Sequence, residues 1–328
     1  KYSDWTQVLS GVPEGSILGP ILFACYIADL PNNIKTSSLA YADDVKIFHR
    51  IKTLGDTDAL QADLNTLSHW SKTWHLKLNP VKCKTISFTL RKAPVLRTYV
   101  LDGHPLERCE EMRDLGVTLD SKLTFAAHVD SVVSRANRML GLLMRSVQTA
   151  QRAHRTVFDH RPIMTAYTAH VRSIVEYGSV IWSGAAATHL KRLERLQHRF
   201  LMWLGCKTRQ RCPPLDYISL LDHFRCQSIK ARFIQIDMSF LRSAMNNRFD
   251  CSDLTSMFSL AVPVRRTRHT GLFHVPTGRV NSVKNSFMLR LPATCNELLR
   301  STPEADFFYP PSAFKSFVRT FGSSAGPY

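Results

Sequence analysis

The sequence Ala42-Asp43-Asp44 separates two short segments, residues 36–41 and 45–50, that contain β-branched and aromatic residues. This pattern predicts a tight β-hairpin with carboxylates at its tip. Adjacent carboxylates repel each other unless cations share their charge. Mg²⁺ prefers carboxylate and phosphate oxygens, and a pair of metal ions can hold both reacting oxygens of a phosphoryl transfer. The hairpin therefore indicates either a divalent-metal site or an ordinary solvated turn, because aspartate is also a common turn residue.

A turn rich in glycine and proline, residues 11–20, leads directly into a predicted helix that ends at Pro31. Glycine lets the backbone approach a ligand closely, and the amides at a helix N-terminus favour anionic groups. The pattern fits a nucleotide-facing turn. The alternative is a loop that only caps the following helix.

The rest of the chain favours an α+β fold. Apolar residues have helical spacing at 56–75, 126–147, 161–177, 189–204 and 215–238, and a short helix is predicted at 312–321. A strand is predicted at 84–89 and a β-hairpin within 100–119. From about residue 263 the sequence is irregular and rich in Arg, Pro and Thr.

Three features find little support in the sequence: a membrane span, a disulfide framework and a zinc site. No segment approaches the roughly 20 apolar residues that a membrane span needs. The eight cysteines are scattered without a CxxC pair, which favours reduced, intracellular thiols. Cys212, His223 and Cys226 could suggest a zinc site, but a fourth ligand at the usual spacing is absent.

The positive charge is confined to the second part of the chain. Residues 1–120 hold 14 Lys/Arg and 14 Asp/Glu, whereas residues 121–328 hold 29 and 12. A surplus of this size favours binding to a polyanion, since each neutralised phosphate releases counterions. The alternative is a basic surface that only confers solubility.

The predicted helix at 189–204 shows how this charge could be used. Its apolar residues form one stripe, and a second stripe consists of Lys191, Arg192, Arg195 and Arg199. One face would pack and the other could follow a nucleic-acid backbone. The alternative is a solvated face partly neutralised by Glu194.

Taken together, the turn GVPEGSILGP at 11–20, the sequence YIADLP at 26–31 and the sequence YADD at 41–44 resemble the palm of reverse transcriptases. The type is the RNA-directed DNA polymerase of animal non-LTR (LINE-type) retrotransposons. Similarity continues at 64–70, 77–85, 115–120, 174–178 with Trp182, and 192–197, and near the end from 284–287 through Asn296 to 314–315, with Cys295 where the family usually has tryptophan. It therefore covers nearly the whole chain and is weakest at 205–262.

The resemblance implies a role for each candidate residue. Asp43 and Asp44 would be catalytic and would bind Mg²⁺ or Mn²⁺, and Tyr41 and Ala42 would lie by the primer end and the incoming nucleotide. The turn residues that would face nucleotide and template are Gly11, Pro13, Glu14 and Gly15. Lys84 would be a cation near the triphosphate, or else only an exposed strand lysine.

The resemblance also implies an architecture and partners. Residues 1–120 would be the C-terminal part of a polymerase palm, an antiparallel sheet with helices; residues 121–205 would be a helical thumb, and 206–328 a basic helical to irregular region. The expected partners are an RNA template, a DNA primer and deoxynucleoside triphosphates, with no membrane and no known protein partner. The expected location is intracellular, in the nucleus.

Two departures from the family pattern bear on activity. Glu14 stands where the family usually has glutamine, and a carboxylate there repels phosphate and offers no amide donor. The family's third metal-binding aspartate comes from an upstream strand, and Asp4 is too close to Gly11 to play that part.

We therefore expect an N-terminally truncated fragment that is inactive alone. One alternative is a non-enzymatic nucleic-acid-binding remnant. Another is an unrelated helical scaffold in which the turn and the hairpin lie far apart.

Overall fold

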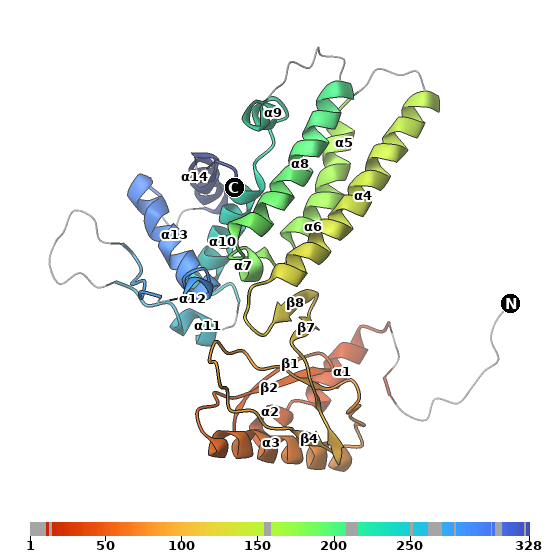
Figure 1. Ribbon diagram of the computed structural model, residues 1–328, viewed down its shortest axis with the longest axis vertical. Coiled ribbons are helices and arrows are strands. Elements are labelled where there is room, and N and C mark those ends of the chain that lie inside the picture. Colours follow the sequence, from red (N-terminus) through yellow and green to blue (C-terminus); the bar gives the residue numbers. More distant parts are fainter. Residues whose placement is uncertain are drawn as a thin grey trace. The chain divides into compact units, whose positions relative to one another are not determined.

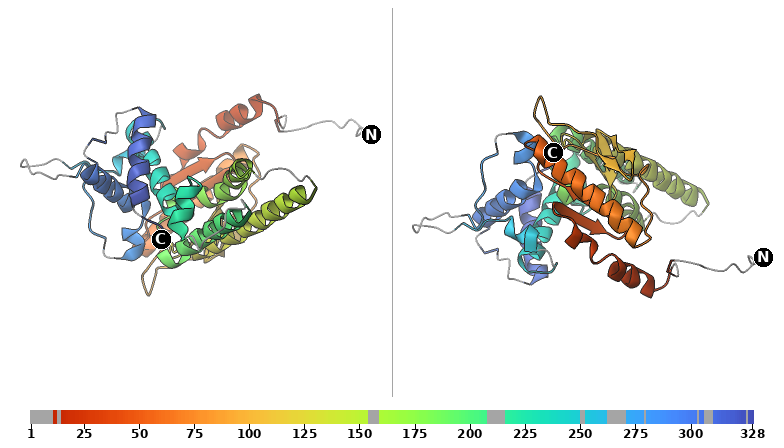
Figure 2. Two further views of the ribbon diagram at one scale, coloured as in Figure 1. Left: turned by 90° about the horizontal axis from the view of Figure 1, so that it is seen from above. Right: turned by 90° about the horizontal axis from the view of Figure 1, so that it is seen from below.

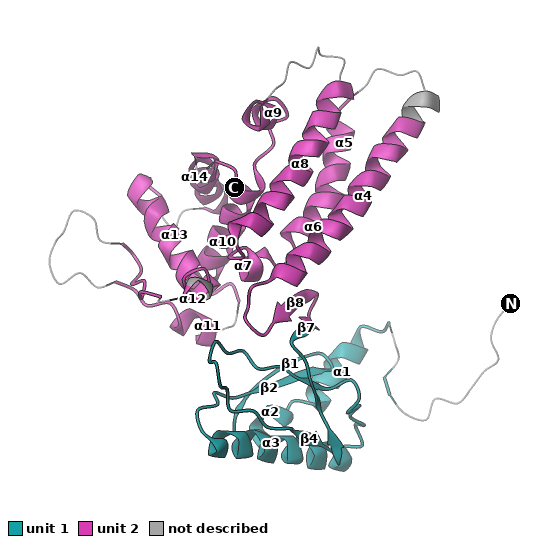
Figure 3. Cartoon of the chain, viewed as in Figure 1, with its two compact units in different colours: residues 1–112 teal, residues 113–328 magenta. Residues whose placement is uncertain are grey.

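The computed structural model describes residues 11–12, 15–153, 159–207, 216–249, 252–261, 271–278, 280–302, 304–305, 310–324 and 326–328. The chain divides into two units, residues 1–112 and 113–328 (Figure 3). The predicted boundaries at 120 and 205 stay predictions.

The first unit is built around the predicted hairpin, which the structure confirms. Helices α1 (Leu18–Tyr26) and α2 (Leu30–Asn33) precede strands β1 (Ser37–Tyr41) and β2 (Asp44–Phe48), and helix α3 (Leu54–Thr73) follows them (Figure 1). The strands pair antiparallel, with Tyr41 opposite Asp44. The Asp56 carboxylate accepts the Thr53 N–H at 2.7 Å and so caps α3.

Short strands complete this unit. Strand β3 (Lys84–Thr85) pairs parallel with β6 (Glu107–Arg108), and β4 (Val100–Leu101) pairs antiparallel with β5 (His104–Pro105). The strand predicted at 84–89 is therefore wrong beyond residue 85. The single hairpin predicted within 100–119 is also wrong, since β7 (Glu111–Asp114) and β8 (Val117–Asp120) form a separate pair. Two positive-φ turns, at Asp102-Gly103 and Leu115-Gly116, allow two short hairpins in place of one.

The core of the first unit lies between α3 and the elements around it. Its buried residues are Leu30, Ile34, Leu67, Trp70, Tyr99, Leu101 and Leu106. Val45 and Ile47 of β2 pack against this cluster. One face of the hairpin is thereby fixed to the unit and the other is left toward solvent.

The second unit is mostly helical (Figures 1 and 2). Its first helices are α4 (Ala126–Ala153), α5 (Arg161–Tyr167), the π-helix η1 (Thr168–Arg172), α6 (Ser173–Glu176), α7 (Ser179–Trp182) and α8 (Ala187–Lys207). The later helices are α9 (Tyr217–His223), α10 (Ile229–Met245), α11 (Ser252–Ser256), α12 (Asn281–Lys284), α13 (Phe287–Ser301) and α14 (Pro311–Ser324). Helices α4 and α8 run side by side.

Most predicted helices in this unit are confirmed, with two exceptions. The helix predicted at 215–238 is broken, because Arg225 has φ 49° and the Ser228 hydroxyl accepts the Ala231 N–H at 3.1 Å to start α10. Helix α13 lies within a part predicted to be irregular, and Pro292 inside it explains why its periodicity was not evident.

Two hydrophobic clusters hold the second unit together. The larger extends from Val117 to Phe233 and includes Trp182 and Phe200, and the smaller extends from Met238 to Val318. The described cysteines are free thiols. In the described parts of the chain, no helix is both long and apolar enough to cross a membrane.

Candidate active site and nucleic-acid interface

The hairpin tip presents both aspartates to solvent. Strand alternation places Tyr41 and Asp44 on the face opposite Val45 and Ile47, and Asp43 lies in the connecting loop. Tyr41 is 65% exposed, so it is not a core aromatic of the hairpin. Two adjacent exposed carboxylates supply the hard oxygen ligands that fit Mg²⁺ or Mn²⁺.

The loop of this hairpin is strained at one residue. Ala42 has φ 51°, a left-handed conformation that costs a residue with a Cβ atom about 1–2 kcal/mol. Such strain in a two-residue loop fixes the relative directions of the residues on either side. Strained non-glycine residues of this kind cluster at functional sites.

This strain predicts opposite effects for two substitutions. Ala42→Gly should raise the free energy of unfolding by about 0.5–1 kcal/mol, because glycine adopts positive φ without steric cost. Ala42→Val should lower it by about 1 kcal/mol or more, because a β-branched side chain disfavours this conformation. Urea unfolding measures both. Ala40→Gly, in regular strand β1, is the matched control and should destabilise; a parallel loss for Ala42→Gly would contradict the strain.

The predicted nucleotide-facing turn is described only in part. Gly11 and Gly15 have φ values of +96° and +76°, which explains the need for glycine at both positions. Pro13 and Glu14 lie outside the described residues, as does Asp4. The Ser16 hydroxyl accepts the Gly19 N–H at 3.0 Å, which supports the start of α1. That the turn and the aspartates share one side of the hairpin stays a prediction.

Lys84 already has a partner. Its Nζ lies 3.2 Å from Glu107 Oε2, an ion pair across the β3–β6 register, and both side chains are well exposed. Such a pair contributes at most about 1 kcal/mol, so Lys84 could exchange it for a phosphate. Its role near a triphosphate stays a prediction.

No set of three or more His, Cys, Asp or Glu side chains within the described residues is arranged to hold a metal ion. That Asp43 and Asp44 bind a metal ion therefore stays a prediction, in which they supply two of the ligands. A complete site in this part of the molecule needs further oxygen atoms, from substrate phosphates or from another carboxylate.

A buried aspartate that sequence reasoning missed anchors the hairpin. Asp63 of α3 is 2% exposed, and its carboxylate accepts the N–H groups of Lys35 and Thr36 at 3.0 and 2.7 Å. Burial opposes ionisation, but these hydrogen bonds outweigh it and lower the pKa of Asp63. Its position within the apolar stripe that includes Leu60 and Leu67 was the available signal.

Helix α8 of the second unit has the two predicted faces. The apolar stripe is buried: Leu190, Leu193, Leu196, Phe200 and Leu204. Lys191, Arg195 and Arg199 are exposed and Arg192 is half-buried. Arg192 pairs with Asp130 of α4, and Arg199 Nη2 donates to Asn137 Oδ1 at 2.6 Å. Lys191 and Arg195 have no ion pair within the described parts of the chain.

Glu194 does not neutralise this face, so that part of the alternative interpretation is wrong. It is 5% exposed, and it accepts the Lys230 N–H at 3.0 Å and a hydrogen bond from the Tyr217 hydroxyl. Burial first, and then the Glu194 charge, raise the pKa of Tyr217, so the phenol stays a donor. Glu194 therefore does not neutralise Lys191 and Arg195, which among the described residues carry the uncompensated charge of the exposed face of α8.

Comparisons with known proteins give a family match for the part of the sequence that includes the hairpin and the turn. Residues 3–119 match the family model described as reverse transcriptase (RNA-dependent DNA polymerase). A probable RNA-directed DNA polymerase from transposon BS of Drosophila melanogaster is 34% identical over 61% of the chain and 22% of that relative. The polymerase from mobile element jockey of Drosophila funebris is 31% identical over 58% and 21%.

The chain spans about a fifth of the length of these curated relatives. A third relative, the probable polymerase from transposon X-element of Drosophila melanogaster, is 28% identical over 61% of the chain. No solved structure matches the chain significantly.

Proposed function

We propose that the chain is part of an RNA-directed DNA polymerase of the non-LTR retrotransposon type, because residues 3–119 match the reverse transcriptase family model and the relatives come from such elements. The reaction is the addition of deoxynucleotides to the 3′ hydroxyl of a DNA primer on an RNA template, in the nucleus. The single observation that carries this proposal is the exposed Asp43-Asp44 tip on a strained hairpin inside the matched domain.

Each described residue of the site has a defined task in this proposal. Asp43 and Asp44 would hold a divalent ion, whose charge would offset that of the triphosphate and of the attacking oxygen. Ala42 fixes their direction, and Tyr41 offers an exposed ring surface beside the primer end. Asp63 keeps the hairpin in place from the opposite side. Catalysis then rests mainly on positioning and electrostatics.

The site requires a further carboxylate, which we assign to a polypeptide segment that packs on the outer face of the hairpin. That face carries Leu39 and Phe48, 61% and 49% exposed; separately, Ile17 and Leu18, at the start of α1, are 88% and 64% exposed. Large apolar residues exposed on one face, as Leu39 and Phe48 are, mark a surface that another segment covers. Within the described residues, β1 and β2 pair only with each other, so an edge is free for an added strand.

The second unit supplies nucleic-acid affinity through α8. Its exposed face carries Lys191 and Arg195 on neighbouring turns, and Arg192 and Arg199 are held on the same helix by α4. Cations spaced along one helix face can follow successive phosphates of a duplex.

Binding of an RNA–DNA duplex by the chain should fall steeply with salt. The double variant Lys191→Glu/Arg195→Glu should weaken binding by about tenfold or more and reduce the slope of log K against log salt by about two. Fluorescence anisotropy from 50 to 300 mM salt, roughly the range over which such binding changes most, measures both. The control Arg91→Glu/Lys92→Glu makes the same charge change on exposed residues of the first unit. Equal losses for both double variants would reject α8 as the duplex surface.

A non-enzymatic nucleic-acid-binding remnant is the second candidate, favoured by the incomplete set of metal ligands among the described residues. One reconstituted protein distinguishes the two candidate functions. Extension of a primed template by a polymerase reconstituted with the upstream part of a relative supports the enzyme. Binding without any extension in that reconstituted protein supports the remnant.

A further inference from the structure

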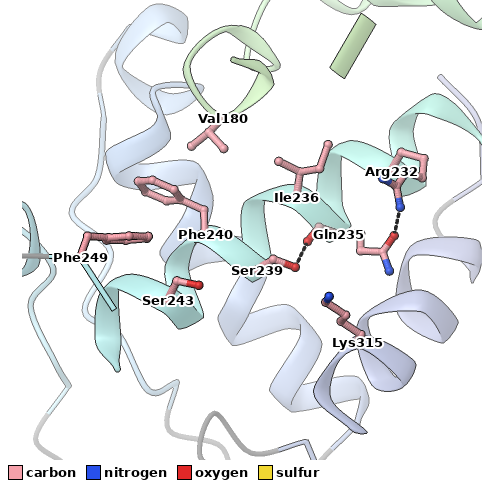
Figure 4. Close-up of a pocket in the computed structure, with 9 residues that line it drawn as sticks. All are labelled: Val180, Arg232, Gln235, Ile236, Ser239, Phe240, Ser243, Phe249 and Lys315. Carbon is pink, nitrogen blue, oxygen red and sulfur yellow. Dashed lines mark hydrogen bonds between the residues drawn. The ribbon is translucent and has the colours of Figure 1, made fainter. Parts of the chain in front are cut away.

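The second unit contains a pocket of about 440 Å³ that the polymerase proposal does not use (Figure 4). Helix α10 forms its floor, Val180 of α7 contributes to one end, and Lys315 of α14 stands at the other. A volume of this size is within the range of small-molecule sites, which begins near 300 Å³. The two ends differ in chemistry.

One end is aromatic and apolar. The rings of Phe240 and Phe249 stack with centroids 5.4 Å apart at 28°, and Val180 lies beside them. Phe240 packs against the smaller hydrophobic cluster of the second unit, whereas the side chain of Phe249 is 38% exposed. Phe249 therefore presents a ring on a rigid support, against which a flat ligand could stack.

The other end carries hydrogen-bond donors. Gln235 accepts a hydrogen bond from Arg232 through Oε1, which turns its amide nitrogen toward Lys315 (Figure 4). Arg232 is itself fixed by Glu176, with Nε–Oε1 and Nη2–Oε2 distances of 2.7 and 3.0 Å. The Lys315 ammonium has no ion pair with a described residue and points into the pocket between Gln235 and Ser239.

We propose that this pocket binds one nucleotide of a single-stranded nucleic acid, with the base against Phe249 and the phosphate between Lys315 and the Gln235 amide. A base has a flat π-face that suits the aromatic end, and its phosphate suits the donor end. Residues 206–328 hold 17 Lys/Arg against 8 Asp/Glu, which favours a polyanion here. A recessed pocket takes an unpaired base and excludes one stacked in a duplex. Only the choice of a polynucleotide rests on the proposed function.

Anisotropy with a ten-nucleotide RNA, the DNA of the same sequence and an RNA–DNA duplex tests the site. Phe249→Ala and Lys315→Glu should each weaken the binding of both single strands by about tenfold. This is the order of one lost base–aromatic stack or phosphate contact. Duplex binding should change by less than about twofold, because the duplex is assigned to α8. AMP should compete with the single strand in the unchanged protein and should fail to do so in Phe249→Ala.

Matched variants separate the pocket from general charge. Arg300→Glu reverses an exposed cation of α13, and Phe88→Ala removes an exposed ring of the first unit. Both should leave single-strand affinity near that of the unchanged chain. Equal loss in these controls, or no loss in the pocket variants, would overturn the proposal.

A covalent probe does not depend on how well the variants fold. RNA containing 4-thiouridine should cross-link to the peptide that carries Phe249 in the unchanged protein, and cross-links confined to other peptides would also overturn the pocket. If the unchanged protein gives the single-strand cross-link at the Phe249 peptide but does not bind the duplex, the result counts against α8 alone.

Discussion

Asp43→Asn should lower primer extension by about a thousandfold or more in a chimera that joins the upstream part of the transposon BS polymerase to Lys1. An amide offers one neutral oxygen to a metal ion and no charge, so the ion that offsets the triphosphate is lost. Asp43 is exposed in the loop of the hairpin and is not part of the buried core of the first unit. The substitution should therefore leave the fold intact.

Duplex affinity should survive this substitution. Binding is assigned to α8, and removal of a negative charge near phosphates favours association if it has any effect. Extension is measured at fixed Mg²⁺ together with duplex affinity at one stated salt concentration. Asp58→Asn, an exposed aspartate of α3, is the matched control and should extend normally. If Asp43→Asn extends at a near-normal rate, the hairpin does not hold the metal.

The isolated chain offers a second measurement of the same site. Paramagnetic broadening by Mn²⁺ should be centred on residues 41–44 and should diminish in Asp43→Asn, since two adjacent carboxylates bind the ion weakly without further ligands. Broadening centred elsewhere would contradict the assignment even in the absence of an activity assay.

Local sequence patterns predicted the hairpin well because its determinants are local. Val45 and Ile47 alternate with polar residues, and a two-residue loop joins strands of equal length. The strand at 84–89 was overestimated because its partner, β6, lies more than 20 residues further along the chain. A parallel pairing at that separation has no local signal.

Whether a charged side chain is buried was harder to predict from the sequence than where the helices lie. Glu194 follows Leu193 within a basic helix, and periodicity alone gave no reason to bury it. Its partners, the Tyr217 hydroxyl and the Lys230 N–H, come from α9 and α10, so only the tertiary fold places it inside. Asp63 was missed for the same reason, since its partners are the N–H groups of Lys35 and Thr36, which directly precede β1.

The stability of the second unit should depend on pH through His128. This side chain is 1% exposed, its Nδ1 accepts the Thr118 N–H at 3.1 Å, and its ring meets Trp182 edge-on at 5.2 Å. Burial first, and then the charges of Arg135 and Arg113, lower the pKa of His128 to about 4. The imidazole is therefore neutral in the fold, and its Nδ1 serves as an acceptor.

The sign of the pH dependence follows from proton counts. Between pH 4 and about 6.5, the unfolded chain protonates His128 and the folded chain does not, so acid favours unfolding. The free energy of unfolding should fall by about 3 kcal/mol across this window as the pH is lowered, with no contribution from His128 above it.

A second buried group acts in the opposite direction and must be separated from His128. Burial raises the pKa of Asp237 to about 6, although its partner Arg290, 3.0 Å away, opposes the rise. The folded chain then binds the extra proton between about pH 4 and 6, so acid stabilises the fold through this group. The two contributions partly cancel in the unchanged protein, and its pH profile alone cannot identify either.

The difference between the unchanged protein and His128→Asn removes this ambiguity. Asparagine can keep an acceptor for the Thr118 N–H and cannot protonate in this range, so Asp237 contributes equally to both proteins and drops out. Urea unfolding at pH 4 to 8 should show an advantage of the unchanged protein that shrinks by about 3 kcal/mol as the pH falls through the window. His170→Asn, an exposed histidine of η1, controls for the loss of a histidine. If the difference in unfolding free energy between the two proteins stays constant with pH, His128 is not held neutral in the fold. The contacts of His128 with Thr118 of β8 and with Trp182 would then tolerate a charged imidazole.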